Sequence, residues 1–161
     1  MPPMSVTPEP HTDRRRSPAS CEPGTLLRLD PMDRIRVLRA GIESVVLVAI
    51  AHATGRSPPE LIDLLQLMPP SPGTTFRKGA RLTTEQSERV LAFLRLIERV
   101  EAMVTSGGDD RAFDAARWLG DWLTTPCPAL GGQRPAVLTD TLEGYRVLDH
   151  LLAQMLSGAY A

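Results

Sequence analysis

Apolar residues recur at helical spacing along the stretch that follows Thr83, and this pattern decides the fold class. Thr83 and Gln86 form a T-x-x-Q capping box at its start, and Gly107-Gly108 interrupts it. The stretch is predicted to be one long amphipathic helix, with apolar residues on one face and charged residues largely opposite. No run of residues alternates as a strand does, and we predict an all-α fold. The inward face comprises Val90, Phe93, Leu94, Ile97, Val100 and Val104.

Two helices are predicted before this stretch. The same spacing indicates one continuous helix from Met32 to Ala53, ended by Gly55. A second helix begins at Ser57, whose side chain is followed by Pro58 at the first helical position and Glu60 at the third. This helix ends by the Pro69-Pro70 pair, because proline restricts the residue before it to extended backbone.

Two helices are predicted after it. Asp109 and Asp110 start one of them, since acidic residues are favoured at the positive end of a helix, and it runs to Leu123. Asp140 and Glu143 fit a capping pattern for the last helix, with Gly158 as its C-cap. The residues expected to face inward on these two helices are Phe113, Ala116, Leu119, Leu123, Tyr145, Leu148, Leu151, Leu152 and Met155.

Proline content separates the first part of the chain from the rest. Residues 1–31 hold seven of the fifteen prolines and almost no apolar periodicity, so we expect a disordered tail there. The remainder divides at Gly107-Gly108 into helical domains 32–106 and 107–161. Residues 31–108 carry ten basic and eight acidic side chains, whereas residues 109–161 carry four basic and seven acidic ones. This asymmetry indicates two surfaces with different partners, or ordinary scatter of charge.

Composition and motifs exclude several classes of protein. The net charge of -1 argues against a histone-like binder, and the two cysteines, Cys21 and Cys127, form no disulfide framework or zinc motif. The N-terminus lacks the apolar segment of a signal peptide and no apolar run could span a membrane, so we expect a cytoplasmic protein. Neither HExxH, GxSxG, Walker A nor GxGxxG occurs, and His52 and His150 lie at polar helix borders. We expect no catalytic activity, no metal and no cofactor.

A short basic segment suggests contact with DNA. The helix that begins at Pro58, a turn and residues 71–81 have the proportions of a helix-turn-helix. The alternative is a solvated connector, because Pro72 and Gly73 disfavour a recognition helix. The side chains that could contact phosphates or base edges are Thr74, Thr75, Arg77, Lys78 and Arg81.

Aromatic residues in the last third of the chain suggest a protein interface. Trp118 and Trp122 are one helical turn apart, a spacing that either widens the core or presents a pair of rings to a partner. The stretch Gly158-Ala159-Tyr160-Ala161 follows the last helix as an apolar and aromatic tip, which either frays or fills a pocket.

The segment from Trp118 to Ala161 resembles the toxin-binding domain of the Xre/MbcA/ParS antitoxin family. That pattern places Trp-Leu near a helix end, then proline, Leu-Gly-Gly-x-x-Pro, a glycine and a valine on the final helix, and Gly-x-aromatic-small at the end. Cys127 stands where the family usually has asparagine. The matching residues here are Trp118-Leu119 or Trp122-Leu123, Pro126, Leu130, Gly131, Gly132, Pro135, Gly144, Val147, Gly158, Ala159, Tyr160 and Ala161.

The resemblance implies a function. Residues 32–106 would form an Xre-like helix-turn-helix domain and residues 107–161 the toxin-binding domain. The partner would be a RES-domain toxin that consumes NAD⁺ or transfers ADP-ribose, and the end of the chain would cover its active site within an oligomeric complex. The N-terminal part would repress the protein's own operon by binding operator DNA. The alternative from another class is a DNA-binding transcription regulator without a toxin partner.

Overall fold

The computed structural model describes residues 22–68, 76, 77, 79–106 and 113–156, and within these ranges the secondary structure is helical apart from one isolated β-bridge. The predicted all-α fold class is therefore confirmed. No described helix is both long and apolar enough to cross a membrane. The elements are α1 (Pro23–Arg28), α2 (Pro31–Ala40), α3 (Val45–Ala53), α4 (Pro58–Leu64), α5 (Thr84–Ser106), α6 (Ala115–Thr124), the 3-10 helices η1 (Pro128–Leu130) and η2 (Pro135–Leu138), and α7 (Leu142–Leu156).

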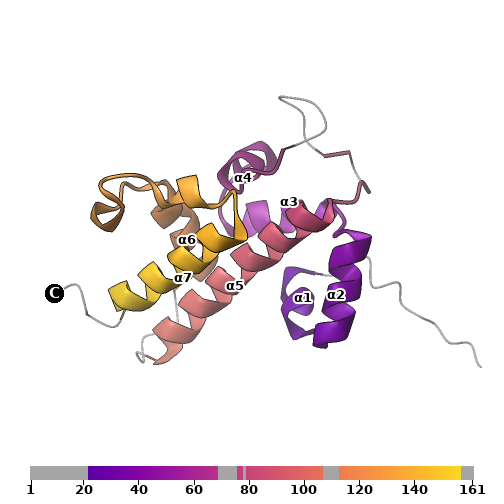
Figure 1. The fold of residues 1–161 in the computed structure, drawn as a ribbon, viewed down its shortest axis with the longest axis horizontal. Helices are drawn as coiled ribbons and strands as arrows, with labels where there is room; N and C mark the ends of the chain where they lie inside the picture. The colour runs from indigo at the N-terminus through magenta and orange to yellow at the C-terminus, as the bar shows by residue number, and fades with distance from the viewer. Residues whose placement is uncertain (1–21, 69–75, 78, 107–112, 157–161) are drawn as a thin grey trace, which may run out of the picture.

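Helix α5 runs through the middle of the molecule (Figure 1). It packs against four other helices, α1, α2, α6 and α7. Its start follows the predicted capping box: the Thr83 N–H donates to Gln86 Oε1 at 2.9 Å, and the Gln86 N–H donates to Thr83 Oγ1 at 3.2 Å. The box at Ser57 and Glu60 also forms and starts α4.

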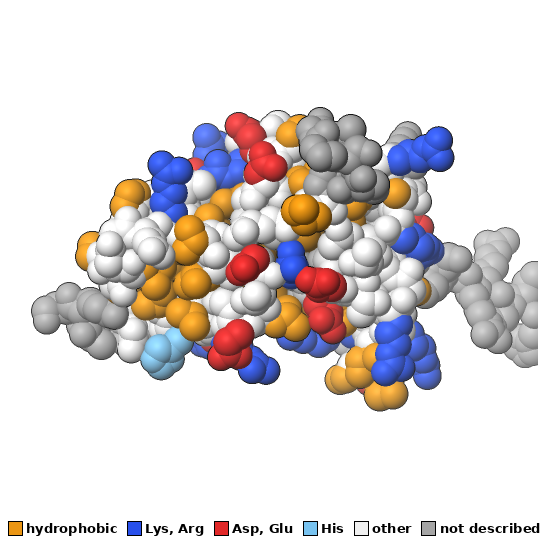
Figure 2. Space-filling model, turned by 45° about the horizontal axis from the view of Figure 1, so that its top comes forward, with side chains coloured by type: hydrophobic (Ala, Val, Ile, Leu, Met, Phe, Trp, Pro, Cys, Tyr) orange, Lys and Arg blue, Asp and Glu red, His pale blue; other side chains and the backbone are white. Residues whose placement is uncertain are grey.

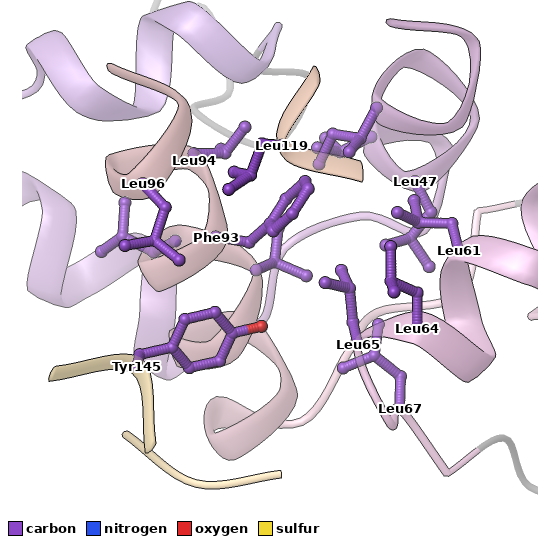
Figure 3. Packing of buried hydrophobic residues seen from close by; sticks show 14 of the residues in the cluster. Leu47, Leu61, Leu64, Leu65, Leu67, Phe93, Leu94, Leu96, Leu119 and Tyr145 are labelled. Carbon is purple, nitrogen blue, oxygen red and sulfur yellow. The ribbon is translucent and has the colours of Figure 1, made fainter. Parts of the chain in front are cut away.

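The core is one cluster of buried apolar side chains centred on Phe93 of α5, which is fully buried. Figure 3 shows Phe93 among leucines from α3, α4 and α6, with the Tyr145 ring of α7 nearby. The cluster contains residues from both predicted domains, 32–106 and 107–161. The boundary between those domains stays a prediction, but the two segments share a core.

The predicted single helix from Met32 to Ala53 is wrong, because Gly41 to Ser44 separate α2 from α3. Gly41 has a φ of +83°, and a Cβ there would lie 2.2 Å from the Leu82 carbonyl oxygen. Beside it, Glu43 and Arg81 form an antiparallel bridge. The apolar residues keep helical spacing across the break, so the sequence pattern conceals it.

The predicted disordered tail over residues 1–31 is too long. Pro23 begins α1, a position where its missing N–H is not needed, and Leu26 is only 1% exposed. Arg34 satisfies the carbonyl end of this short helix: its guanidinium donates to Leu26 O at 3.2 Å and to Leu27 O and Leu29 O at 2.7 Å. Residues 1–21 lie outside the described residues.

Both C-terminal helices start later than predicted. Asp114 caps α6 by accepting from the Arg117 N–H at 3.0 Å, and Phe113, which precedes the cap, is 41% exposed rather than inward. Asp109, Asp110 and Gly158 lie outside the described residues.

On α7 the first-turn N–H of Gly144 is satisfied by the hydroxyl of Thr141 at 3.0 Å, one residue after the predicted Asp140. Met155, also predicted to face inward, is 40% exposed. The other four predicted inward residues of α7 are buried, namely Tyr145, Leu148, Leu151 and Leu152.

Gly144 allows α7 to pass close to η2, and we expect Gly144→Ala to destabilise the protein. A Cβ at this position would lie 1.8 Å from the Leu138 carbonyl oxygen, so backbone would have to move. The cost should be about 2 kcal/mol or more, as for overpacked cores, measured by urea unfolding. Gly24→Ala is the matched control, because nothing lies within 4 Å of its Cβ and alanine favours the helix. Equal stability of both variants would contradict the close approach.

Tyr145 carries a buried hydroxyl without a hydrogen-bond partner, so Tyr145→Phe should leave stability unchanged or raise it by about 1 kcal/mol near neutral pH. Burial raises the pKa of Tyr145 well above its usual value of 10, partly opposed by the positive charge of Arg89. Because the pKa of Tyr145 is higher in the folded than in the unfolded chain, the free energy of unfolding keeps its full value below about pH 10. It falls as the pH rises further, because the tyrosine of the unfolded chain ionises first.

The wild type should therefore lose more stability than Tyr145→Phe between about pH 9 and pH 11 in urea unfolding. A variant that is clearly less stable at neutral pH would show that the hydroxyl has a partner.

Candidate functional site

Helix α6 presents a row of aromatic rings. Trp118 and Trp122 stack with ring centroids 6.2 Å apart and planes 7° apart, and Phe113 lies 6.1 Å from Trp118 at a tilt of 48°. Leu119 and Leu123, each one position further along, are fully buried and attach α6 to the core. Both tryptophans are half-buried, so one part of each ring packs on the core and another part reaches the surface. We call Phe113, Trp118 and Trp122 the aromatic row.

Residues 125–139, here called the Pro-Gly loop, follow α6 as an ordered turn. The Cys127 N–H donates to Gln133 O at 2.9 Å, and Cys127 O accepts from the Leu130 and Gly132 N–H groups at 3.0 Å. Gly131 and Gly132 have φ values of +64° and +83°, which glycine adopts without strain. The two short 3-10 helices, each begun by a proline, complete a compact loop.

Two side chains join the Pro-Gly loop to the end of α4 by hydrogen bonds. The hydroxyl of Thr139, which is fully buried, lies 2.7 Å from the Leu64 carbonyl oxygen at the end of α4. Gln66 Nε2 donates to the Ala136 carbonyl oxygen at 2.9 Å. The end of α4 and the loop are thus joined by direct hydrogen bonds over about 70 positions of sequence.

Large apolar side chains are exposed near the loop. Figure 2 shows hydrophobic side chains gathered at the left of the molecule, the end that α7 and the Pro-Gly loop occupy in Figure 1. Exposed apolar patches of this kind mark protein interaction sites more often than chance. The exposed large apolar residues of η2 and α7 are Val137, Leu142, Val147 and Met155.

Five of the ten predicted interface residues lie at or near the surface of two consecutive elements, α6 and the Pro-Gly loop. Trp118 and Trp122 lie on α6, whereas Pro126, Leu130 and Gly131 lie on the Pro-Gly loop that follows it. Pro126 and Gly131 are exposed and Leu130 is half-buried.

Pro135 is buried, so it supports the loop from within and offers no surface to a partner. Gly158, Ala159, Tyr160 and Ala161 lie outside the described residues.

Sequence reasoning missed Phe113 and Val137 as surface residues. Phe113 lies five positions before Trp118, which is no helical spacing, and it contacts that ring from the segment ahead of the cap. Val137 is 48% exposed because η2 turns it outward, and no periodicity identifies a 3-10 turn of four residues.

The predicted DNA-contacting segment is described only in part. Thr74, Thr75 and Lys78 lie outside the described residues, and residues 76, 77 and 79–81 contain no helix. Arg77 is exposed, and its carbonyl oxygen accepts from the Ser44 hydroxyl at 2.9 Å.

Arg81 is engaged within the protein. Its guanidinium donates to Gly41 O at 2.9 Å and lies 3.5 Å from a Glu43 carboxylate oxygen. Arg77 is therefore the stronger candidate for a phosphate contact.

The described part of the chain holds no metal-ligand cluster, since no group of three or more His, Cys, Asp or Glu side chains converges there. Cys127 is buried, while His52 and His150 are exposed. The surface is suited to contact with another macromolecule through aromatic and apolar side chains.

Comparison with known proteins agrees with this surface. Residues 101–158 match the family described as the antitoxin Xre/MbcA/ParS C-terminal toxin-binding domain, and this segment contains the aromatic row and the Pro-Gly loop. The chain is 39% identical over 136 residues to a protein of Sphingobium sp. (strain YBL2) named Prs ADP-ribosylating antitoxin, covering 84% of this chain and 86% of the relative. No solved structure matches the chain significantly. The chain therefore belongs to the Xre/MbcA/ParS family of antitoxins, proteins that bind a toxin rather than catalyse a reaction.

Proposed function

We propose that this antitoxin neutralises an ADP-ribosylating toxin of the RES-domain class and that residues 158–161 cover the toxin's active site. The observation that carries the proposal is the aromatic row beside the preformed Pro-Gly loop, within the segment that matches a toxin-binding domain. The Sphingobium relative supports the reaction class, because its name refers to ADP-ribosylation. The RES class and the covering role come from the family resemblance of the sequence.

The aromatic row has the properties of a binding anchor. Tryptophan is enriched among the residues that contribute most to protein interfaces, especially next to well-packed apolar surface. Stacking and core contacts already restrict Trp118 and Trp122, so a partner that binds them immobilises little additional side-chain freedom. The Pro-Gly loop contributes a second ordered surface that follows α6 directly.

Charge also favours this partner. Residues 109–161 carry seven acidic and four basic side chains, an excess of three negative charges. A toxin that takes up a dinucleotide needs a cleft that attracts its phosphates, so the region around that cleft is expected to be positive. Opposite potentials on the two surfaces raise the association rate and orient the partners.

The place where α7 ends fits the covering role. Helix α7 ends at the same end of the molecule that the Pro-Gly loop occupies (Figure 1). Tyr160 offers a flat aromatic ring, which is suited to a pocket shaped for a nucleotide base.

Removing residues 158–161 from the full chain should restore toxin activity while leaving the complex intact. The test co-expresses the truncated chain with the RES-domain protein encoded beside it and measures cellular NAD⁺ and co-purification. We expect NAD⁺ loss with continued co-purification, because the aromatic row and the loop remain. Full neutralisation by the truncated chain would contradict the covering role.

Trp122→Ala, in contrast to the truncation, should weaken the binding of the toxin. We expect its Kd for the toxin to rise roughly 30-fold, which corresponds to about 2 kcal/mol of binding free energy. The matched control is Met32→Ala, an exposed apolar residue of α2 outside the proposed interface. An unchanged affinity of Trp122→Ala in a folded protein would exclude the aromatic row as an anchor.

A second candidate function is repression of the antitoxin's own operon through the segment around Arg77. Two observations support this function: the Arg77 side chain is exposed, and the Ser44 hydroxyl holds the Arg77 backbone by a hydrogen bond to its carbonyl oxygen. Contacts from basic side chains to phosphates position a protein on DNA, and each contact makes the affinity depend on salt.

The double variant Arg77→Ala, Lys78→Ala should weaken operator binding and lower the slope of log K against log salt concentration by about 0.9 for each lost contact. Arg81→Ala is the comparison, and it should lower thermal stability because it removes the bonds to Gly41 and Glu43. An unchanged salt slope in the double variant would exclude a phosphate contact there. A chain that binds DNA but retains no neighbouring protein would instead be a regulator without a toxin partner.

A further inference from the structure

Helix α4 ends in a conformation that suits glycine, yet the residue there is Gln66. The Leu67 N–H donates to Ile62 O at 2.9 Å and the Gln66 N–H to Asp63 O at 3.1 Å, which is the hydrogen-bond pattern of a helix ended by a left-handed residue. Gln66 has a φ of +49°, and no other described non-glycine residue has a positive φ. A residue with a Cβ is strained in this left-handed backbone conformation. We therefore expect contacts of Gln66 that compensate for the strain.

The side chain and the backbone of Gln66 both have distant partners. Its Nε2 donates to the Ala136 carbonyl oxygen of η2 at 2.9 Å. Its own carbonyl oxygen accepts from the Arg89 guanidinium of α5 at 2.9 Å. Gln66 therefore connects the end of α4 to both α5 and the Pro-Gly loop.

Thr139 completes the connection. Its hydroxyl lies 2.7 Å from Leu64 O and 2.8 Å from Ala136 O, and it has only one proton to donate. Ala136 O already accepts from Gln66 Nε2 and from the Thr139 N–H at 3.2 Å. The hydroxyl proton is therefore assigned to Leu64 O, a carbonyl at the end of α4 that has no helical partner.

We propose that Gln66 and Thr139 are positioning residues that hold the Pro-Gly loop in the shape that binds the toxin, an inference that rests on the proposed function. The main-chain hydrogen bonds described for residues 127–139 join residues within the loop, so they shape it without attaching it. Gln66 and Thr139 supply the attachment to α4. Glycine at position 66 would relieve the backbone but remove this link, which accounts for the strained glutamine.

The hydrogen bonds of Gln66 and Thr139 affect toxin affinity by raising the fraction of molecules in which the Pro-Gly loop has its binding shape. If the loop without its link keeps the binding shape for a fraction of the time, the apparent Kd rises by the inverse of that fraction. A loop that is correctly placed about a tenth of the time would bind about tenfold more weakly. Stability need not fall in parallel, because Gln66→Gly removes backbone strain together with the side-chain bond.

The experiment compares full-length wild type with Gln66→Gly, Thr139→Val and Thr139→Ser. Each is measured for Tm, for hydrogen exchange of the loop amides in the free protein, and for Kd with the RES-domain protein encoded beside it. Gln66→Gly should keep a Tm within about 3 °C of wild type. Its loop amides should exchange several-fold faster, and its Kd should rise about tenfold. Thr139→Val should show the same exchange and Kd changes, whereas Thr139→Ser keeps the hydroxyl and should behave as wild type.

Unchanged loop exchange in both Gln66→Gly and Thr139→Val would overturn the inference. Faster exchange with an unchanged Kd would also overturn it, because the loop would then be ordered for another reason than toxin binding. A wild-type chain that binds no neighbouring protein would overturn the proposed function instead, and the exchange data would still decide whether the link orders the loop.

Discussion

Burial of the apolar face of α5 is the interaction on which the rest of the molecule depends. Val90 and Phe93 are fully buried, and Leu94 and Val100 are at most 4% exposed. Each such side chain contributes about 2 kcal/mol when it is removed from water. A 23-residue helix cannot supply that burial alone, so the shorter helices are placed by the need to cover it from several sides.

This packing also determines the recognition surface. Leu119 and Leu123 fix one side of α6 to the core, so the neighbouring positions Trp118 and Trp122 fall at the boundary between core and solvent. Helix α7 packs on α5 as well, with Tyr145 and Leu148 inward, and it leaves Leu142, Val147 and Met155 exposed. A binding protein gains from this arrangement, because its surface is held by the same contacts that fold the chain.

The C-terminal part is not independent of the part before it. Besides the shared core, the Arg56 guanidinium donates to the Gly120 carbonyl oxygen of α6, and Thr139 bonds the end of α4. These two bonds join the C-terminal part to the link between α3 and α4 and to the end of α4.

The sequence alone determined the all-α class, the extent of α5 and the capping boxes that begin α4 and α5, and it predicted that Trp118 and Trp122 lie one helical turn apart on the same helix. These features depend on residues within one or two helical turns of each other, so the spacing in the chain reveals them. Only the tertiary structure decided the break at Gly41, the exposure of Phe113 and the left-handed backbone of Gln66. Each of these depends on a contact with a residue distant in sequence or on a turn without periodicity: Leu82 approaches Gly41, and Ala136 holds Gln66. Periodicity records which side of a helix is apolar but not which backbone atoms will lie against it.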